Sequence, residues 1–161
     1  MDFDLNEEQK MIQETIRKFA KEKIAPVARE NDKKAQFSRD IFNKLAELGF
    51  MGTPIPEEYG GAGFDYISHA IVAEEIGKVD SSLRGTYSVQ VSLVELPIFK
   101  FGSEEQKKKY LPKLTSGEWI GCYGLTEPNS GSDPASMIST AKEDGACRKD
   151  RLKTALGGKV C

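Results

Sequence analysis

The 161-residue sequence lacks the features that mark membrane, secreted and nucleic-acid-binding proteins. No uninterrupted apolar run reaches the roughly 18 residues that a membrane span requires. No apolar leader follows Met1, so we predict no signal peptide. Lys and Arg number 23 against 25 Asp and Glu. Without a surplus of positive charge to neutralise phosphates, we expect no nucleic-acid partner.

Cysteine and histidine are also scarce. The three cysteines, Cys122, Cys147 and Cys161, form no CxxC pair. They predict free thiols in a reducing, cytoplasmic setting and no zinc site. His69 is the single histidine, which excludes any catalytic or metal site that needs two. We expect His69 to have a structural role at the surface or half-buried.

The remaining composition is that of a globular protein. Apolar residues make up 39% of the chain and aromatic residues 9%, which is enough for a core. The net charge of −2 is unevenly distributed, because five basic residues against one acidic residue give residues 146–161 a charge of +4. Residues 1–145 therefore carry −6, and we interpret 146–161 as a solvated basic tail.

Most of the chain has helical patterning. Asn6 with Gln9, and Ser103 with Gln106, form capping boxes in front of helical segments. Apolar residues then recur at helical spacing, and Pro26 is expected to end the first helix. The predicted helices cover residues 6–25, 38–48, 65–78 and 103–111.

Two stretches have strand character. Residues 87–93 alternate apolar and polar side chains with period two, which is typical of a half-buried strand, although the turn-free length of 81–96 suits a helix better. Pro97 is expected to kink or end either element. Residues 119–125 are apolar and aromatic and predict a buried strand, with a further strand over 137–142. The chain thus predicts a helical domain followed by the start of a β domain.

The string YGLTEPNSGSD at residues 123–133 is the most specific feature of the sequence. It closely resembles the flavin-binding signature of acyl-CoA dehydrogenases, and the segments 5–26, 45–63 and 101–133 resemble the same family in the same order. The resemblance implies a mainly α fold: an N-terminal helical domain over 1–117, the first strands of a central β domain over 118–145, and a divergent tail over 146–161. It also implies that 81–96 is helical.

The signature has a physical interpretation of its own. Ser130, Gly131 and Ser132 follow a predicted strand, where backbone N–H groups and hydroxyls can hold a pyrophosphate and a glycine permits close approach. By itself the pattern is weak, because such strings are mostly turns. The resemblance implies finer roles. Tyr123, Leu125 and Thr126 would line the flavin ring of FAD, Gly131 and Ser132 would meet its pyrophosphate, and Ser132 would also touch the acyl-CoA. Ordinary strand core is the alternative for Tyr123 and Leu125, and loop hydrogen bonding is the alternative for Thr126 and Glu127.

The family's reaction is α,β-dehydrogenation of an acyl-CoA thioester, in which a glutamate removes the α proton and the β hydrogen leaves as hydride to the flavin. Electrons pass on to an electron-transfer flavoprotein, and family members are homo-oligomers. The catalytic glutamate of the family has no counterpart here, so we assign no catalytic residue and no metal ligand. We expect this chain alone to be inactive.

A narrower similarity points to glutaryl-CoA dehydrogenases. Arg84 and Ser88, with the residues that follow, resemble the substrate-end helix of those enzymes, where an arginine pairs with the distal carboxylate. At i and i+4 the two side chains share one helix face. One departure is Gly77, because the glutaryl-specific enzymes carry an acidic residue seven positions before the arginine. A surface arginine is the alternative interpretation.

The resemblance ends at about residue 145. The tail lacks the strand and the Trp-Ile-Thr that a family member carries next, and we expect a truncated product that arises from a frameshift, an altered gene model or an early stop. Two other hypotheses remain open. One is a flavin monooxygenase or acyl-CoA oxidase relative, and the other is a non-catalytic helical remnant or interaction module.

Overall fold

The computed structural model describes residues 4–140 and divides the chain into two compact units, Met1–Cys122 and Tyr123–Cys161. Unit 1 is helical. Its α-helices are α1 Glu7–Phe19, α2 Ala25–Lys33, α3 Arg39–Glu47, α4 Tyr66–Gly77, α5 Ser81–Ser88, α6 Leu96–Phe101 and α7 Glu104–Thr115. Two π-helices, η1 Ala20–Ile24 and η4 Val89–Glu95, and two 3₁₀ turns, η2 Phe50–Gly52 and η3 Glu57–Tyr59, complete it. In unit 2 the described residues contain the 3₁₀ turn η5 Pro134–Ser136.

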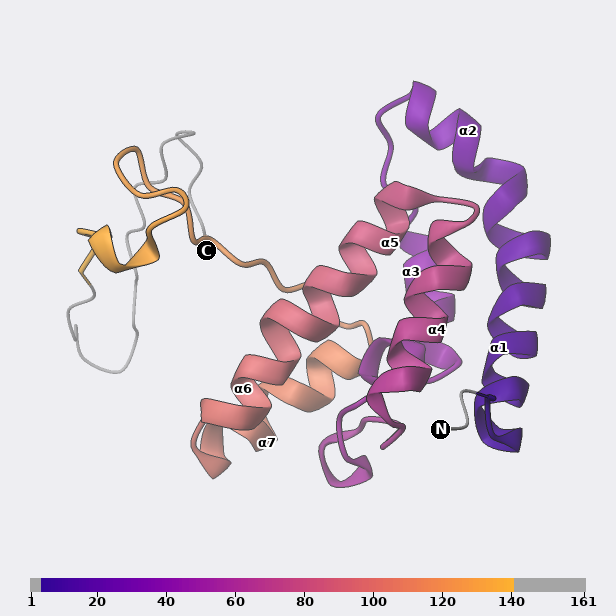
Figure 1. The fold of residues 1–161 in the computed structure, drawn as a ribbon, viewed down its shortest axis with the longest axis horizontal. Coiled ribbons are helices and arrows are strands. Elements are labelled where there is room, and N and C mark those ends of the chain that lie inside the picture. Colours follow the sequence, from indigo (N-terminus) through magenta and orange to yellow (C-terminus); the bar gives the residue numbers. More distant parts are fainter. Residues whose placement is uncertain (1–3, 141–161) are drawn as a thin grey trace. The chain divides into compact units, whose positions relative to one another are not determined.

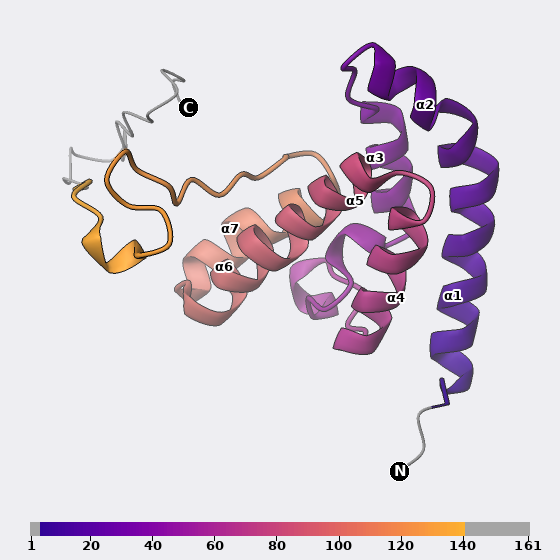
Figure 2. The same ribbon diagram turned by 45° about the horizontal axis from the view of Figure 1, so that its top comes forward.

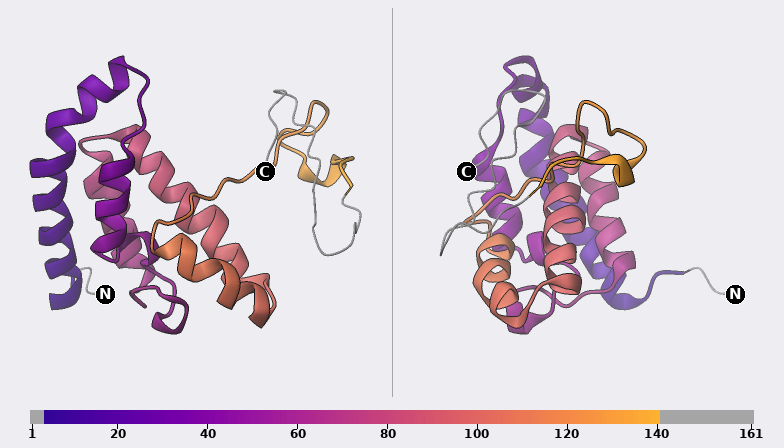
Figure 3. Two further views of the ribbon diagram at one scale, coloured as in Figure 1. Left: turned by 180° about the vertical axis from the view of Figure 1, so that it is seen from behind. Right: turned by 90° about the vertical axis from the view of Figure 1, so that its left-hand side faces the viewer.

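Unit 1 is organised around one long helical run. The helices α5, η4 and α6 follow one another without a break, and this run passes along α4 at one end and along α7 at the other (Figures 1 and 3). The first helix, α1, lies beside the outer side of α4, and α7 turns back along α6 (Figure 2). The mainly helical fold predicted from the sequence is confirmed, including a helix over 81–96.

The core lies between α1, α3, α4 and α5. Its fully buried side chains include Ile16, Phe42, Leu45, Val72 and Tyr87. A second, smaller cluster joins η3 to α7 through Ile55, Tyr59 and Leu111. The capping boxes Asn6–Gln9 and Ser103–Gln106 are both present and begin α1 and α7, as predicted.

Neither Pro26 nor Pro97 ends its helix, and the prediction that Pro26 stops the first helix was wrong. A proline in a helix has no N–H and its ring clashes with the carbonyl four residues earlier. Here each proline follows a π-helix, where the hydrogen bonds reach back five residues. The N–H of Ala25 donates to the carbonyl of Ala20, and the N–H of Leu96 donates to the carbonyl of Val91. The wider turn therefore carries the helix past the proline.

The strand predicted over 119–125 does not form. Residues 120–126 are irregular, and in the described part of unit 2 the only pairing is an isolated bridge between Glu127 and Ser130. A strand needs a neighbouring strand to satisfy its N–H and C=O groups, and the described residues supply none. The second predicted strand, 137–142, is irregular up to 140, and its last two residues lie outside the described range. The basic tail over 146–161 lies outside that range as well.

In the described part of the chain, no helix is both long and apolar enough to span a membrane.

Candidate functional site

The signature forms a closed loop, residues 126–139, held by Glu127. The N–H of Glu127 donates to the carbonyl of Ser130 at 2.9 Å, and the N–H of Ser130 donates back at 3.1 Å. The Glu127 carboxylate accepts from the N–H groups of Ile138 at 2.8 Å and Ser139 at 3.0 Å. These hydrogen bonds lower the pKa of Glu127. One carboxylate thus joins the two ends of the loop, which is the loop hydrogen bonding expected as the alternative role of Glu127.

Serine hydroxyls fix the inside of this loop. Ser130 is buried, and its hydroxyl donates to the carbonyl of Asp133 at 2.7 Å. The hydroxyl of Ser136 donates to the same carbonyl at 2.9 Å. The Asp133 carboxylate accepts from the N–H of Ala135 at 3.1 Å. The loop conformation is therefore set by its own polar groups and needs no strand beside it.

Gly131 and Ser132 form the outer turn of the loop, and both are exposed. A Cβ built on Gly131 would meet no heavy atom within 4 Å. Among the described residues, no hydrogen bond uses the N–H of Gly131, the N–H of Ser132 or the Ser132 hydroxyl. N–H and O–H donors that converge on one point can hold an anion.

The charge of the loop opposes anion binding. Residues 123–140 contain Glu127 and Asp133 and no Lys or Arg. The Glu127 carboxylate is partly neutralised by the two N–H groups that it accepts from. A phosphate at Gly131 and Ser132 would depend on hydrogen bonds, with no cation from this segment.

The three residues expected at the flavin ring are all exposed. Tyr123 is 52% exposed and Leu125 37%, and Thr126 is exposed as well. Strand core, the alternative for Tyr123 and Leu125, is therefore not what this structure shows. Both side chains present apolar surface to solvent in this structure.

Arg84 and Ser88 lie one turn apart on α5, the first exposed and the second half-buried. The Arg84 side chain lies against Gly77, where an added Cβ would be 3.2 Å from the Arg84 Cγ. Gly77, the position at which the sequence departs from the glutaryl-specific pattern, therefore lies directly beside the arginine. Within residues 4–140 the Arg84 guanidinium makes no ion pair. Arg84 and Ser88 belong to unit 1 and the signature to unit 2, and the structure describes each group by itself.

Sequence reasoning found no partner for His69, but the structure gives it two. Its Nδ1 lies 2.7 Å from the Tyr87 hydroxyl, and its Nε2 lies 3.0 Å from the Ser92 hydroxyl. The Tyr87 hydroxyl also lies 2.9 Å from that of Thr53. Burial lowers the pKa of His69 and raises that of Tyr87. We call this set, with the Phe50 carbonyl that accepts from Thr53, the His69 network.

A second buried polar group lies in η4. The Gln90 Nε2 donates to Glu95 Oε1 at 3.3 Å, and both side chains are fully buried. Burial raises the pKa of Glu95 to about 9. The other carboxyl oxygen, Oε2, has no hydrogen-bond partner. Glu95 is thus a neutral acid at pH 7.

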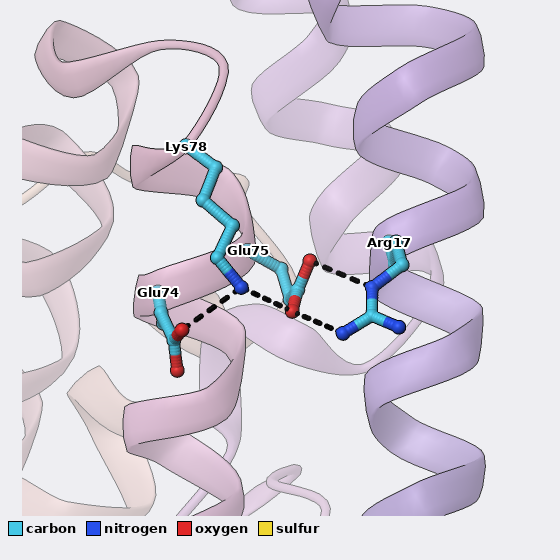
Figure 4. Close-up of polar contacts among 4 residues, drawn as sticks. All are labelled: Arg17, Glu74, Glu75 and Lys78. Carbon is cyan, nitrogen blue, oxygen red and sulfur yellow. Dashed lines mark hydrogen bonds and ion pairs between the residues drawn. The ribbon is translucent and has the colours of Figure 1, made fainter.

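Arg17 and Glu75 join α1 to α4 (Figure 4). The guanidinium donates to both carboxylate oxygens, at 2.9 and 3.1 Å, and Lys78 adds a contact at 2.8 Å. Glu75 is only 3% exposed, and the hydrogen bond from Arg17 is the main reason that its pKa is lowered. Both cations are committed to carboxylates, so this cluster is structural. Among the described residues, no set of His, Cys, Asp or Glu side chains could hold a metal ion.

Comparison with known proteins identifies relatives over most of the chain. Residues 6–118 match the family model of the acyl-CoA dehydrogenase N-terminal domain. The probable acyl-CoA dehydrogenase YngJ of Bacillus subtilis is 46% identical over 145 residues, which are 90% of this chain and 38% of that protein. The chain therefore spans little more than a third of this relative.

Two solved structures show the same fold. One is titled the electron transferring flavoprotein of Acidaminococcus fermentans, and a chain in it aligns with a TM-score of 0.86 and 43% identity over 90% of this chain and 38% of that one. The other is a glutaryl-coenzyme A dehydrogenase in complex with glutaryl-CoA, with a TM-score of 0.84 and 44% identity over 88% of this chain and 36% of that one. The family-model match covers most of the sequence, and the chain belongs to the acyl-CoA dehydrogenase family.

Proposed function

We propose that this chain supplies the helical domain and the flavin-binding loop of an FAD-dependent enzyme that dehydrogenates an acyl-CoA thioester between its α and β carbons. The observation that supports this most directly is the loop at Gly131 and Ser132, whose free N–H and hydroxyl donors lie within the string that resembles the family's signature. FAD supplies the redox chemistry when bound. The chain supplies the groups that hold and orient it.

The proposed roles follow the resemblance residue by residue. Gly131 and Ser132 hold the pyrophosphate, and Ser132 also contacts the acyl-CoA. Tyr123, Leu125 and Thr126 cover the flavin ring, which accounts for apolar side chains that are exposed in this structure. We place the domain boundaries of the protein at residues 117 and 145. The electron acceptor is an electron-transfer flavoprotein, and the enzyme is a cytoplasmic homo-oligomer.

Arg84 and Ser88 are proposed to recognise the far end of the acyl group. An exposed guanidinium without an ion pair suits a carboxylate, and Ser88 lies one turn further along the same face of α5. We therefore propose a dicarboxylyl-CoA substrate. Gly77, which stands where the glutaryl-specific enzymes carry an acidic residue, lies beside Arg84 and is a departure from their pattern.

A second proposal applies to the 161 residues in isolation. By the resemblance, the family's catalytic glutamate has no counterpart in this chain, and the described part of the flavin loop has no second strand beside it. We propose that the isolated polypeptide does not turn over acyl-CoA and acts, at most, as a binding module.

One purification tests both proposals. The chain is incubated with FAD, freed of excess flavin, and its visible spectrum recorded. Retained flavin bands support cofactor binding by this segment. A colourless chain leaves only the non-catalytic role. Dye reduction on addition of acyl-CoA would contradict the second proposal.

Two glycine variants make the test specific. Gly131→Ala adds a methyl group at the proposed pyrophosphate contact, and Gly124→Ala adds one elsewhere in the same segment. An added Cβ meets no heavy atom within 4 Å at either position, so neither change creates a clash. We expect FAD binding to weaken in Gly131→Ala and to persist in Gly124→Ala. Equal binding by both variants would remove Gly131 from the site.

A further inference from the structure

The π-helix η4 brings together side chains that are five residues apart in the sequence. Gln90 bonds to Glu95 directly, and Tyr87 and Ser92 bond to the two nitrogens of the same His69 ring. In an α-helix, residues five apart point about 140° away from each other. In a π-turn, where hydrogen bonds run from i to i+5, they return to nearly the same side. Both pairings therefore depend on the π-helical register.

The direction of every hydrogen bond in the His69 network follows from its last acceptor. The Thr53 hydroxyl has one proton and donates it to the Phe50 carbonyl, which can only accept. Tyr87 must then donate to Thr53, and the Tyr87 oxygen accepts from the Nδ1–H of His69. In a neutral imidazole the other nitrogen, Nε2, is an acceptor, so Ser92 donates to it. The network specifies the Nδ1–H tautomer.

The Gln90 amide connects the same π-helix to the chain that enters the signature. Its Nε2 shares two protons among three acceptors, the carbonyls of Leu114 at 3.1 Å and Trp119 at 3.2 Å and Glu95 Oε1 at 3.3 Å, and its Oε1 accepts from the N–H of Gly121 at 2.7 Å. Gly121 lies so close to η4 that an added Cβ would be 2.5 Å from the Val94 Cγ1. The register of η4 therefore decides where the segment 119–121 lies.

We propose that His69 is a positioning residue. As the Nδ1–H tautomer, it holds the run of α5 and η4 in its π-helical register. It thereby fixes the position of the segment 119–121, which leads into the signature, relative to Arg84 and Ser88. The assignment of Arg84, Ser88 and the signature to the active site rests on the proposed function. The hydrogen-bond network and its consequence for the segment 119–121 do not depend on that assignment.

The tautomer is directly measurable, because His69 is the only histidine in the sequence. The chain labelled with ¹⁵N-histidine gives one pair of ring nitrogens, and long-range ¹H–¹⁵N correlation identifies the protonated one. We expect the proton on Nδ1, whereas the free imidazole of histidine favours Nε2–H. A native chain with the proton on Nε2 would overturn the proposal.

Two variants test the direction of the network. Tyr87→Phe removes the acceptor of the Nδ1–H, and Ser92 is then free to accept, so the ring should change to the Nε2–H tautomer. Ser92→Ala removes the other partner and leaves the Nδ1–H to Tyr87 intact, so the tautomer should not change. The opposite pattern, or no change in either variant, would contradict the derived direction.

The positioning role has a separate measurement. In His69→Phe, which fills the space without hydrogen bonds, we expect amide exchange of Gly121 to accelerate about tenfold more than that of Leu45 in α3, since a lost hydrogen-bond network loosens its own region first. A purely structural contribution would accelerate both amides equally, and that result would refute positioning. The FAD spectrum is independent of these measurements. A chain that binds flavin but has the Nε2–H tautomer refutes only the positioning role of His69. A colourless chain with the Nδ1–H tautomer refutes only flavin binding.

Discussion

Glu95 provides the sharpest test of the energetics of unit 1. Its side chain is fully buried in η4, one carboxyl oxygen accepts from Gln90, and the other has no partner. Burial raises the pKa from an ordinary 4.5 to about 9 in the folded chain. Between these values the folded state holds a proton that the unfolded state releases, so folding becomes less favourable as the pH rises.

The substitution Glu95→Gln removes this proton and keeps the shape. The Gln carbonyl still accepts from Gln90, and its NH₂ replaces a hydroxyl that has no acceptor, so the neutral forms of both chains bury a similar orphan donor. The wild-type chain has its full stability below pH 4.5 and loses it progressively towards pH 9. At pH 7 the variant is expected to be more stable by up to about 3 kcal/mol, and the difference should grow by about 1.4 kcal/mol per pH unit.

Urea unfolding followed by far-UV circular dichroism at pH 5, 6, 7 and 8 measures this difference. Glu105→Gln on the exposed surface of α7 is the matched control, since it makes the same chemical change without burial, and its difference from wild type should stay nearly constant with pH. A Glu95→Gln difference that is also constant would refute the neutral buried acid. A variant less stable than wild type at pH 8 would refute it as well.

Two further substitutions test contacts that hold unit 1 together. Arg17→Met should destabilise the chain by about 1–2 kcal/mol, because it removes two charge-assisted hydrogen bonds from the buried Glu75; Lys10→Met, at an exposed pair, should change the free energy of unfolding by less than about 0.5 kcal/mol. Gly121→Ala should cost about 1–3 kcal/mol, because the new methyl group overlaps Val94. Urea unfolding measures all three, and equal costs for Arg17→Met and Lys10→Met, or an unchanged Gly121→Ala, would contradict these interpretations.

Local signals in the sequence predicted the helix starts correctly because the interactions that make them are local. The capping boxes at Asn6 and Ser103 need only a side chain three residues away, and both are formed. The strand predicted over 119–125 failed for the opposite reason, since a strand depends on a partner from elsewhere in the chain. The predicted burial failed as well, because Trp119, Ile120, Tyr123 and Leu125 are all at least 37% exposed, and the start of the segment is held instead by the hydrogen bond from Gly121 to Gln90 in η4.

The candidate site, like the fold, was predicted only in part from the sequence. The signature residues and the Arg84–Ser88 pair came from resemblance, and their roles stay predictions. Loop hydrogen bonding was the alternative expected for Glu127, but its partners were not predicted, because they are backbone N–H groups eleven and twelve residues further along the chain. Gly77 was noted as a departure from the glutaryl-specific pattern, and the structure adds that it lies beside Arg84.

The π-helix explains why residues 87–93 read as a strand. The buried positions in this stretch are Tyr87, Gln90 and Val91, followed by Glu95, and two of these four are polar. Leu93, which contributes to the apolar alternation, is 43% exposed. The apolar alternation therefore marked only part of the buried face: Tyr87 and Val91 are buried, but Gln90 and Glu95, which complete that face, are polar. Gln90 and Glu95, five residues apart and shortly before Pro97, meet because of the π-helical turn between them.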